Sequence, residues 1–216
     1  MAACNLIFFQ TGLASPCQNL FSLEPDITVG RQHTLADQIV VLRLGHRIPR
    51  DLRVTTHVCL TARAFGADGL ILADVVDTAL DKTILDVRKR FGGSFWIRMG
   101  EPWRQAVKDW KSKGGEIVHL TAYGISLPEA VKTIKGSSRP KLVVVGAEKV
   151  PGEVYEAADW NVAVTNQPIS EVSALAMFLD RYFEGRQFSM EFDNAELKII
   201  PSARGKKVVN LAEPED

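Results

Sequence analysis

Two strand-to-helix turns in the C-terminal half of the chain could hold a small molecule with their backbone groups. The first is VGAEKVP at 145–151, where Gly146 lets the backbone approach a ligand closely. The second is VTNQPISE at 164–171, where the amides of Asn166 and Gln167 can pair with the edge of an adenine or a ribose. Each turn, taken alone, is also compatible with an ordinary connection between a strand and a helix. Together they predict a pocket for a nucleoside-type cofactor.

Arginines form a second group of residues that could do chemistry. The run RLGHRIPRDLRVTTHVCLTAR, residues 43–63, contains a single acid, Asp51. Guanidinium groups with few carboxylates nearby create a local positive field that suits phosphates. A solvated loop is the plain alternative. The arginines of this run are Arg43, Arg47, Arg50, Arg53 and Arg63.

The sequence lacks the signatures of several other chemistries. It has neither G-x-x-x-x-G-K-[ST] nor G-x-G-x-x-G, which disfavours P-loop and dinucleotide-binding folds. Ser170 has no evident His or Asp partner, which disfavours a nucleophilic hydrolase. The histidines show no metal-site spacing and we expect no metal; three of them, predicted to be structural, are His46, His57 and His119. Caps of helices and solvated faces, rather than a magnesium site, are expected for Asp68, Asp74, Asp77, Asp81 and Asp86.

Composition sets broad limits on the molecule. A chain of 216 residues that is 46% apolar supports one sizeable core. The 26 basic and 26 acidic residues balance, so a nucleic-acid surface must be a local patch. The three cysteines are unpatterned, which fits a reducing cytoplasm, and no apolar run approaches the roughly 20 residues of a membrane span. The N-terminal LIFF patch lacks the basic flank of a signal peptide.

Strands and helices alternate from Gln38 onward, which predicts a mostly parallel sheet covered on both faces. The expected strands are 39–44, 70–74, 95–99, 116–122, 141–147 and 161–165. The main expected helices are 56–65 (capped by Thr55 or Thr56), 78–92, 102–115, 127–136 and 168–184. Residues 1–37 sustain no period and read as an N-terminal extension of uncertain order. Residues 38–185 form the main domain, and 186–216, with FSMEF, LKII and KKVVNL, a β-rich extension.

Several of these motifs, in this order, resemble a known family. They are LRLGHRIPRDLRVTTHVCLTARAFGADG, HLTAYG, VVVGAEKVPGEVYEAADWNVAV and TNQPISEVSALAMFLDRYFEG. The chain is similar to the archaeal tRNA 2′-O-methyltransferases of the SPOUT superfamily that modify cytidine 56 in the TΨC loop. The resemblance covers residues 38–185 almost continuously and extends loosely over the C-terminal tail, where the family carries an added α–β element.

The resemblance implies a deep trefoil knot in the C-terminal half of the sheet, an exception to the rule that chains avoid knots. It also implies that the knot holds S-adenosylmethionine. Carried over by motif, the cofactor-binding residues are Leu120, Gly146, Ala147, Glu148, Lys149, Val150, Val164, Thr165, Asn166, Gln167, Pro168, Ile169, Ser170 and Glu171.

The resemblance further implies a homodimer that binds tRNA and methylates a ribose without a metal. An arginine of the N-terminal run would help remove the proton of the 2′-OH or orient that hydroxyl. The candidates are Arg47, Arg50, Arg53 and Arg63, of which Arg63 and Arg53 are favoured. The family's wider superfamily has an asparagine where Thr55, Thr56 and His57 stand here, so this choice rests on position alone. RNA phosphates are assigned to Arg43, Arg47 and Arg50.

Three other functions stay open at this point. The chain could be a SPOUT methyltransferase acting on another RNA nucleotide, which mapping of the product would reveal. It could be a non-catalytic RNA- or nucleotide-binding α/β protein, whose melting temperature S-adenosylmethionine would not shift. A small-molecule α/β enzyme, the most distant alternative, would bind no RNA.

Overall fold

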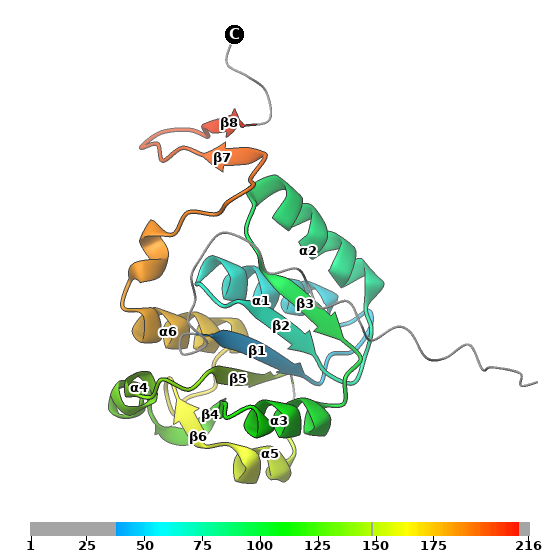
Figure 1. Ribbon diagram of the computed structural model, residues 1–216, viewed down its shortest axis with the longest axis vertical. Helices are drawn as coiled ribbons and strands as arrows, with labels where there is room; N and C mark the ends of the chain where they lie inside the picture. The colour runs from blue at the N-terminus through cyan, green and yellow to red at the C-terminus, as the bar shows by residue number, and fades with distance from the viewer. Residues whose placement is uncertain (1–37, 148, 212–216) are drawn as a thin grey trace, which may run out of the picture.

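The computed structural model describes residues 38–147 and 149–211 and shows helices on both faces of a twisted sheet (Figure 1). Within these ranges the sheet has six strands in the order β3-β2-β1-β5-β4-β6, and each neighbouring pair is parallel. The strands are β1 (Ile39–Leu44), β2 (Gly69–Leu72), β3 (Trp96–Met99), β4 (Glu116–Ser126), β5 (Lys141–Gly146) and β6 (Trp160–Ala163). The predicted α/β class is confirmed. The extension predicted at 1–37, and Glu148, lie outside the described residues.

Apolar side chains pack on both faces of the central strands. In β1, Val41 belongs to one core cluster while Val40 and Leu42 belong to the other, as the two-residue period of a strand requires. Helices α1, α2, α4 and α6 cover the first face, and α3 and α5 cover the second. The helices are α1 (Leu52–Ala64), α2 (Thr78–Phe91), α3 (Trp103–Ser112), α4 (Leu127–Gly136), α5 (Gly152–Ala157) and α6 (Glu171–Phe183). None of those within the described ranges is long and apolar enough to cross a membrane.

Every strand of this sheet leads into a helix at the same edge. Because the six strands are parallel, the turns that follow them all lie along the carboxyl edge, and the returning connections lie along the amino edge. Ligands of open α/β sheets bind outside the carboxyl ends of the strands. The two turns singled out by their residue types, after β5 and after β6, both lie at this edge.

Two helices begin three or four residues away from where they were predicted to begin. Helix α1 starts at Leu52 rather than near Thr56, because Thr55 is fully buried and its hydroxyl contacts His46 instead of capping a helix. Helix α6 starts at Glu171 rather than at Pro168, and the Ser170 hydroxyl caps it by accepting a hydrogen bond from the Val172 amide at 3.2 Å.

The C-terminal segment is less β-rich than predicted. Helix α6 ends where Glu184 and Gly185 take left-handed backbone angles, with φ of 53° and 81°. FSMEF is not a strand: its first two residues belong to the short 3₁₀-helix η2 (Arg186–Ser189), and the others form a connecting segment. An antiparallel hairpin of β7 (Leu197–Ile199) and β8 (Val208–Asn210) follows as a separate small sheet.

Candidate functional site

A cavity of about 340 Å³ lies at the carboxyl edge of the sheet. Its walls come from three segments: the end of β4, the end of β5, and the turn from β6 into α6. The lining residues are Leu120, Thr121, Ala122, Val145, Gly146, Ala147, Val164, Thr165, Gln167, Pro168, Ile169, Glu171 and Ala174. Backbone and small side chains thus form most of a site whose size suits a small organic ligand.

The cavity brings together most of the residues predicted to bind a cofactor. Leu120, Gly146 and Ala147 line it, as do residues 164–165, 167–169 and Glu171. The remaining described candidates have other places: Lys149 is exposed, and Val150 packs on the α3 and α5 side of the core. Asn166 donates to a carbonyl of β4, and Ser170 caps α6.

Sequence reasoning missed four lining residues. Thr121 and Ala122 directly follow Leu120 in the HLTAYG motif, and Val145 begins the VGAEKVP motif, so taking each motif whole would have found them. Ala174 lies three residues after Glu171, which places it on the same face of α6.

The last part of β4 beside the cavity, residues 121–126, is held in place by close backbone contacts. A Cβ on Gly124 would come within 2.5 Å of the Asn161 backbone, so only glycine fits there. The Asn166 side-chain amide donates to the Ala122 carbonyl at 2.8 Å and to the Gly124 carbonyl at 3.4 Å. This end of β4 presents Tyr123, which is 87% exposed, next to two residues of the cavity wall.

Glu171 brings charge to the cavity wall and pairs with an arginine beneath it. Arg43 Nη2 donates to Glu171 Oε1 at 2.9 Å, and the Arg43 side chain is fully buried. The Arg43 Nε and Nη1 groups have no hydrogen-bond partner among the described residues. The expectation that Arg43 contacts RNA phosphates is therefore wrong, since it lies in the core and supports the cavity wall. The second carboxylate oxygen of Glu171 can accept a hydrogen bond from a bound hydroxyl.

The arginine run continues from β1 into α1 at the carboxyl edge, and its first turn is fastened by an ion pair. Arg47 donates from Nε and Nη2 to the two carboxylate oxygens of Asp51, at 2.7 Å and 3.0 Å. These hydrogen bonds from Arg47 lower the pKa of Asp51 to about 2. Arg50 and Arg53 are exposed and form no ion pair with the described residues, so their guanidinium groups face solvent.

A buried histidine ties this loop to the start of α2. His46 Nδ1 lies 2.8 Å from Thr55 Oγ1, and its Nε2 lies 3.0 Å from Asp77 Oδ2. Asp77 also caps α2, because its Oδ1 accepts from the amides of Ala79 and Leu80. Burial by itself raises the pKa of Asp77, but the hydrogen bonds from His46 and the two amides outweigh it and lower that pKa. His46 and Asp77 therefore have the structural roles predicted for them.

The two arginines predicted for catalysis lie at opposite ends of α1. Arg53 is in the first turn, at the carboxyl edge, whereas Arg63 is in the last turn, at the amino edge. The Arg63 Nη2 donates to the carbonyls of Phe91 and Gly92, each at 2.7 Å. Its guanidinium carbon lies 4.3 Å from the centroid of the Phe192 ring. Burial, together with the charge of the nearby Arg88, lowers the pKa of Arg63.

Comparison with known proteins shows similarity over most of the chain. The family described as tRNA ribose 2′-O-methyltransferase, aTrm56, matches residues 91–209. A relative from Methanoregula boonei is 53% identical over 174 residues, which cover 81% of this chain and 98% of that protein. Another from Thermococcus kodakarensis is 55% identical over 176 residues, 80% of this chain and 97% of that protein. Both relatives are named tRNA (cytidine(56)-2′-O)-methyltransferase.

Solved structures share the fold at low sequence identity. A crystal structure of an RNA 2′-O ribose methyltransferase superposes with a TM-score of 0.54 at 19% identity, over 75% of this chain and 62% of that one. The TrmH/SpoU tRNA modifying enzyme of A. aeolicus superposes with a TM-score of 0.50 at 17% identity, over 71% and 77%. The fold expected from the sequence motifs is confirmed at this level.

Proposed function

The chain belongs to the tRNA ribose 2′-O-methyltransferase family, and from this membership we propose that it methylates the ribose 2′-oxygen of cytidine 56 in the TΨC loop of tRNA, with S-adenosylmethionine as methyl donor. The observation that carries the proposal is that the motif residues shared with the family converge on one cavity. Nine of the residues carried over as cofactor-binding line that cavity, although they come from three separate segments.

The cavity fits S-adenosylmethionine in size and in the chemistry of its walls. Leu120 and Val164 offer apolar contact to an adenine, and backbone groups near Gly146 can pair with its polar edge. The second oxygen of Glu171 suits a ribose hydroxyl. When bound, the cofactor supplies a methyl group already activated by a sulfonium centre.

The protein's main task is then to place a weak nucleophile. A ribose 2′-OH must be aligned with the methyl group, and its proton must leave as the oxygen attacks. We assign the orientation of this hydroxyl to Arg53, because it is exposed and lies in the first turn of α1, at the edge that carries the cavity. A guanidinium stays protonated, so Arg53 donates hydrogen bonds to the oxygen rather than accepting its proton, which passes to solvent water. Arg63, the other candidate, is engaged with two backbone carbonyls, and we assign it to the fold.

Phosphate binding falls to the exposed part of the arginine run. Arg50 is free of ion pairs with the described residues and can meet a phosphate directly. Arg47 retains a side chain 33% exposed while it fastens the loop through Asp51. We also assign to Tyr123, which is exposed beside the cavity, a stacking contact with an unpaired base of the target loop.

The proposal includes a homodimer with RNA crossing the subunit interface. It is supported by exposed apolar side chains on the two adjacent helices α1 and α6, namely Val54 at 39% and Met177 at 42% exposure. A trefoil knot around the cavity and a location in the cytoplasm are part of the same proposal, supported by the shared fold and by the tRNA substrate.

A methyl-transfer assay with purified protein, labelled S-adenosylmethionine and unmodified tRNA tests the function. We expect one methyl group per tRNA, mapped to the ribose of cytidine 56. The matched control is the same tRNA with 2′-deoxycytidine at that position, which should accept none. Transfer to another nucleotide would discard the substrate assignment and keep the cofactor site. Absence of S-adenosylmethionine binding by folded protein would overturn the proposal.

A further inference from the structure

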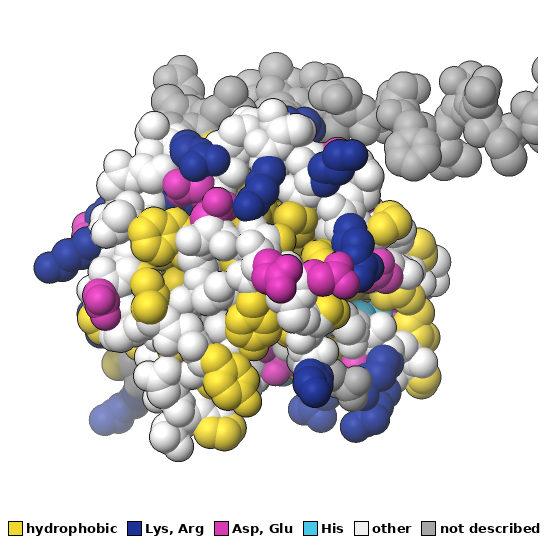
Figure 2. All heavy atoms as spheres, turned by 90° about the horizontal axis from the view of Figure 1, so that it is seen from below, with side chains coloured by type: hydrophobic (Ala, Val, Ile, Leu, Met, Phe, Trp, Pro, Cys, Tyr) yellow, Lys and Arg dark blue, Asp and Glu magenta, His cyan; other side chains and the backbone are white. Residues whose placement is uncertain are grey.

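The C-terminal hairpin is positively charged, although the chain as a whole has no net charge. Residues 197–210 contain four basic residues and no acidic one, although the whole chain has 26 of each kind. The four are Lys198 on β7 and Arg204, Lys206 and Lys207 in the loop that joins the two strands. On the end of the molecule away from the hairpin, acidic side chains lie among the basic ones over much of the face, and some basic side chains gather at one corner (Figure 2). The hairpin is thus a local positive patch.

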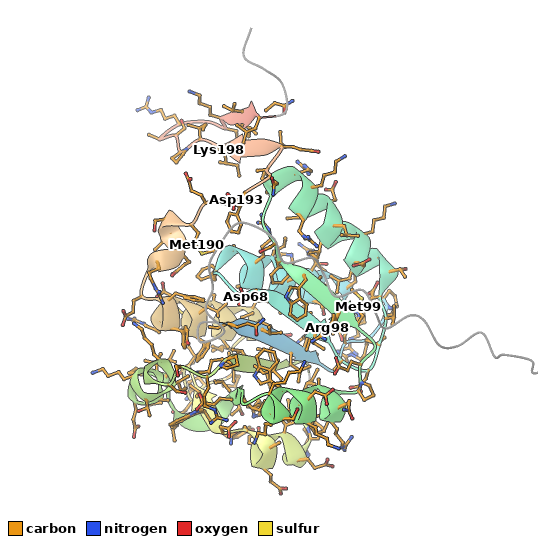
Figure 3. All side chains as sticks on the ribbon, in the orientation of Figure 1. Asp68, Arg98, Met99, Met190, Asp193 and Lys198 are labelled. Carbon is orange, nitrogen blue, oxygen red and sulfur yellow. The ribbon has the colours of Figure 1, made fainter. Side chains whose placement is uncertain are left out.

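The charges at the tip of the hairpin are available to a ligand. Arg204, Lys206 and Lys207 are all exposed and form no ion pair with the described residues. Lys198, labelled on the hairpin in Figure 3, approaches Glu191 at 3.6 Å, but both side chains are largely exposed. Such exposed pairs contribute only about 0–1 kcal/mol, so Lys198 can exchange this partner for another anion.

The hairpin is anchored at its base and projects beyond the sheet (Figure 1). The Gly93 amide donates to the Asp193 carbonyl at 2.8 Å, and a Cβ on Gly92 would come within 2.4 Å of that same carbonyl oxygen. Lys89 of α2 lies 3.8 Å from Glu196. A two-stranded hairpin alone is marginally stable, so these contacts with the end of α2 give it a fixed direction.

The hairpin and the cavity lie at opposite edges of the sheet. Helix α2 runs from the carboxyl edge to the amino edge, and the hairpin is attached at its final residues. The cavity lies at the carboxyl edge, where β4, β5 and β6 end. The hairpin of one subunit therefore does not touch a nucleotide bound at that subunit's own cavity.

From this arrangement we propose that the hairpin is a second RNA-binding surface, which holds phosphates of the tRNA away from the nucleotide being methylated. The identity of the RNA rests on the proposed function. The hairpin also exposes the cross-strand pair Ile199 and Val208, at 63% and 53%, which a second copy of the chain could cover. The charge of the hairpin favours RNA over a second copy of the chain. Its four cations, with no acid among them, complement a polyanion, whereas the chain itself has zero net charge.

The test removes the three tip cations in the full chain with Arg204→Gln, Lys206→Gln and Lys207→Gln together. Binding of unmodified tRNA is measured at several salt concentrations. Loss of two or three phosphate contacts should make the slope of log affinity against log salt shallower by about 2. The ratio of the wild type's tRNA affinity to that of the variant should then fall roughly 20-fold as salt rises from 50 to 200 mM. In methyl transfer, the loss should fall on KM for tRNA rather than on kcat, and S-adenosylmethionine should bind as before.

A matched control removes the same charge from α2, α3 and the residue after α3, with Lys82→Gln, Lys108→Gln and Lys113→Gln, three exposed positions. An equal change of slope in this control would show a general field effect and overturn the proposal. An unchanged tRNA affinity in the hairpin variant, or a change in sedimentation without a change in RNA affinity, would also overturn it. If the wild type binds tRNA through the hairpin yet methylates none, the proposed function fails and the hairpin inference stands.

Discussion

Removing Glu171 should destabilise the protein far more than removing its partner Arg43. In the variant Glu171→Ala, the Arg43 guanidinium stays fully buried and loses its one hydrogen-bonded carboxylate, while its Nε and Nη1 groups are already without partners in the described structure. A guanidinium cannot relieve this by losing its proton. In the variant Arg43→Met, by contrast, the buried charge disappears, and Glu171, with a side chain 22% exposed, can turn to water.

The magnitude follows from the burial of each partner. Breaking a buried ion pair by removing one side costs about 3–5 kcal/mol. The partial exposure of Glu171 places Glu171→Ala at the lower end, at about 3 kcal/mol. Replacing the arginine by an apolar residue of similar volume should cost about 1 kcal/mol or less. The double variant should resemble Arg43→Met, so the coupling between the two positions is about 3 kcal/mol.

Urea unfolding without cofactor measures these differences, because Glu171 also lines the cavity and a bound ligand would add its own stabilisation. For a domain of this size, 3 kcal/mol corresponds to a fall in Tm of about 6–12 °C. If the two single changes prove equally costly, or if their effects add within about 0.5 kcal/mol, the argument from buried charge is wrong.

Four further predictions follow from the site. Arg63→Ala should cost about 2 kcal/mol in urea unfolding, since two buried carbonyls lose their donor, with methyl transfer per folded molecule retained; a lost kcat at unchanged stability would instead make Arg63 catalytic. Arg53→Gln should lower kcat roughly 100-fold with S-adenosylmethionine affinity unchanged, and an unaltered kcat would remove Arg53 from the reaction. Because the pKa of Asp51 is about 2 in the folded protein and 3.8 when unfolded, its ionised carboxylate stabilises the fold above about pH 4. This stabilisation should be lost as pH falls from about 4 to 2, and the free energy of unfolding of Asp51→Asn should lack that part of the fall with pH. Tyr123→Ala should raise KM for tRNA roughly 5- to 100-fold, and Tyr123→Phe should restore it; an equal loss in both would exclude stacking.

Elements with a strong period could be predicted from the sequence. The six strands of the sheet are short apolar runs bounded by turns, and each of them appears in the structure. FSMEF alternates like a strand but has no neighbouring strand to pair with, so it forms a 3₁₀ turn and a connecting segment instead. Strand formation depends on a partner, which local alternation does not reveal.

The cavity was predicted better than the arginines around it. Residues near Gly146 and Gln167 lie in continuous motifs, so identifying each motif placed its residues together on the wall. The position of Arg43 depends on a carboxylate 128 residues away in the sequence. A charged residue in a strand is expected to be exposed unless a buried partner is known. The sequence pattern therefore predicted an exposed position for Arg43.

Thr55 was misjudged for a similar reason. A threonine before an apolar periodic run reads as a helix cap, yet its hydroxyl contacts the buried ring of His46. The true first residue of α1 follows Asp51, whose carboxylate is occupied by Arg47 rather than by the helix amides. Competition among nearby polar groups decides such caps, and three-dimensional proximity settles the competition.

The link from His46 to Asp77 makes one cooperative unit of two segments 31 residues apart. Asp77 holds the first turn of α2 with one oxygen and the histidine ring with the other, so fraying of that turn releases the arginine loop as well. Local opening of the two segments is therefore a shared event with a single free energy. The start of a helix 31 residues away in the sequence thereby sets how long the loop that carries the exposed arginines keeps its arrangement.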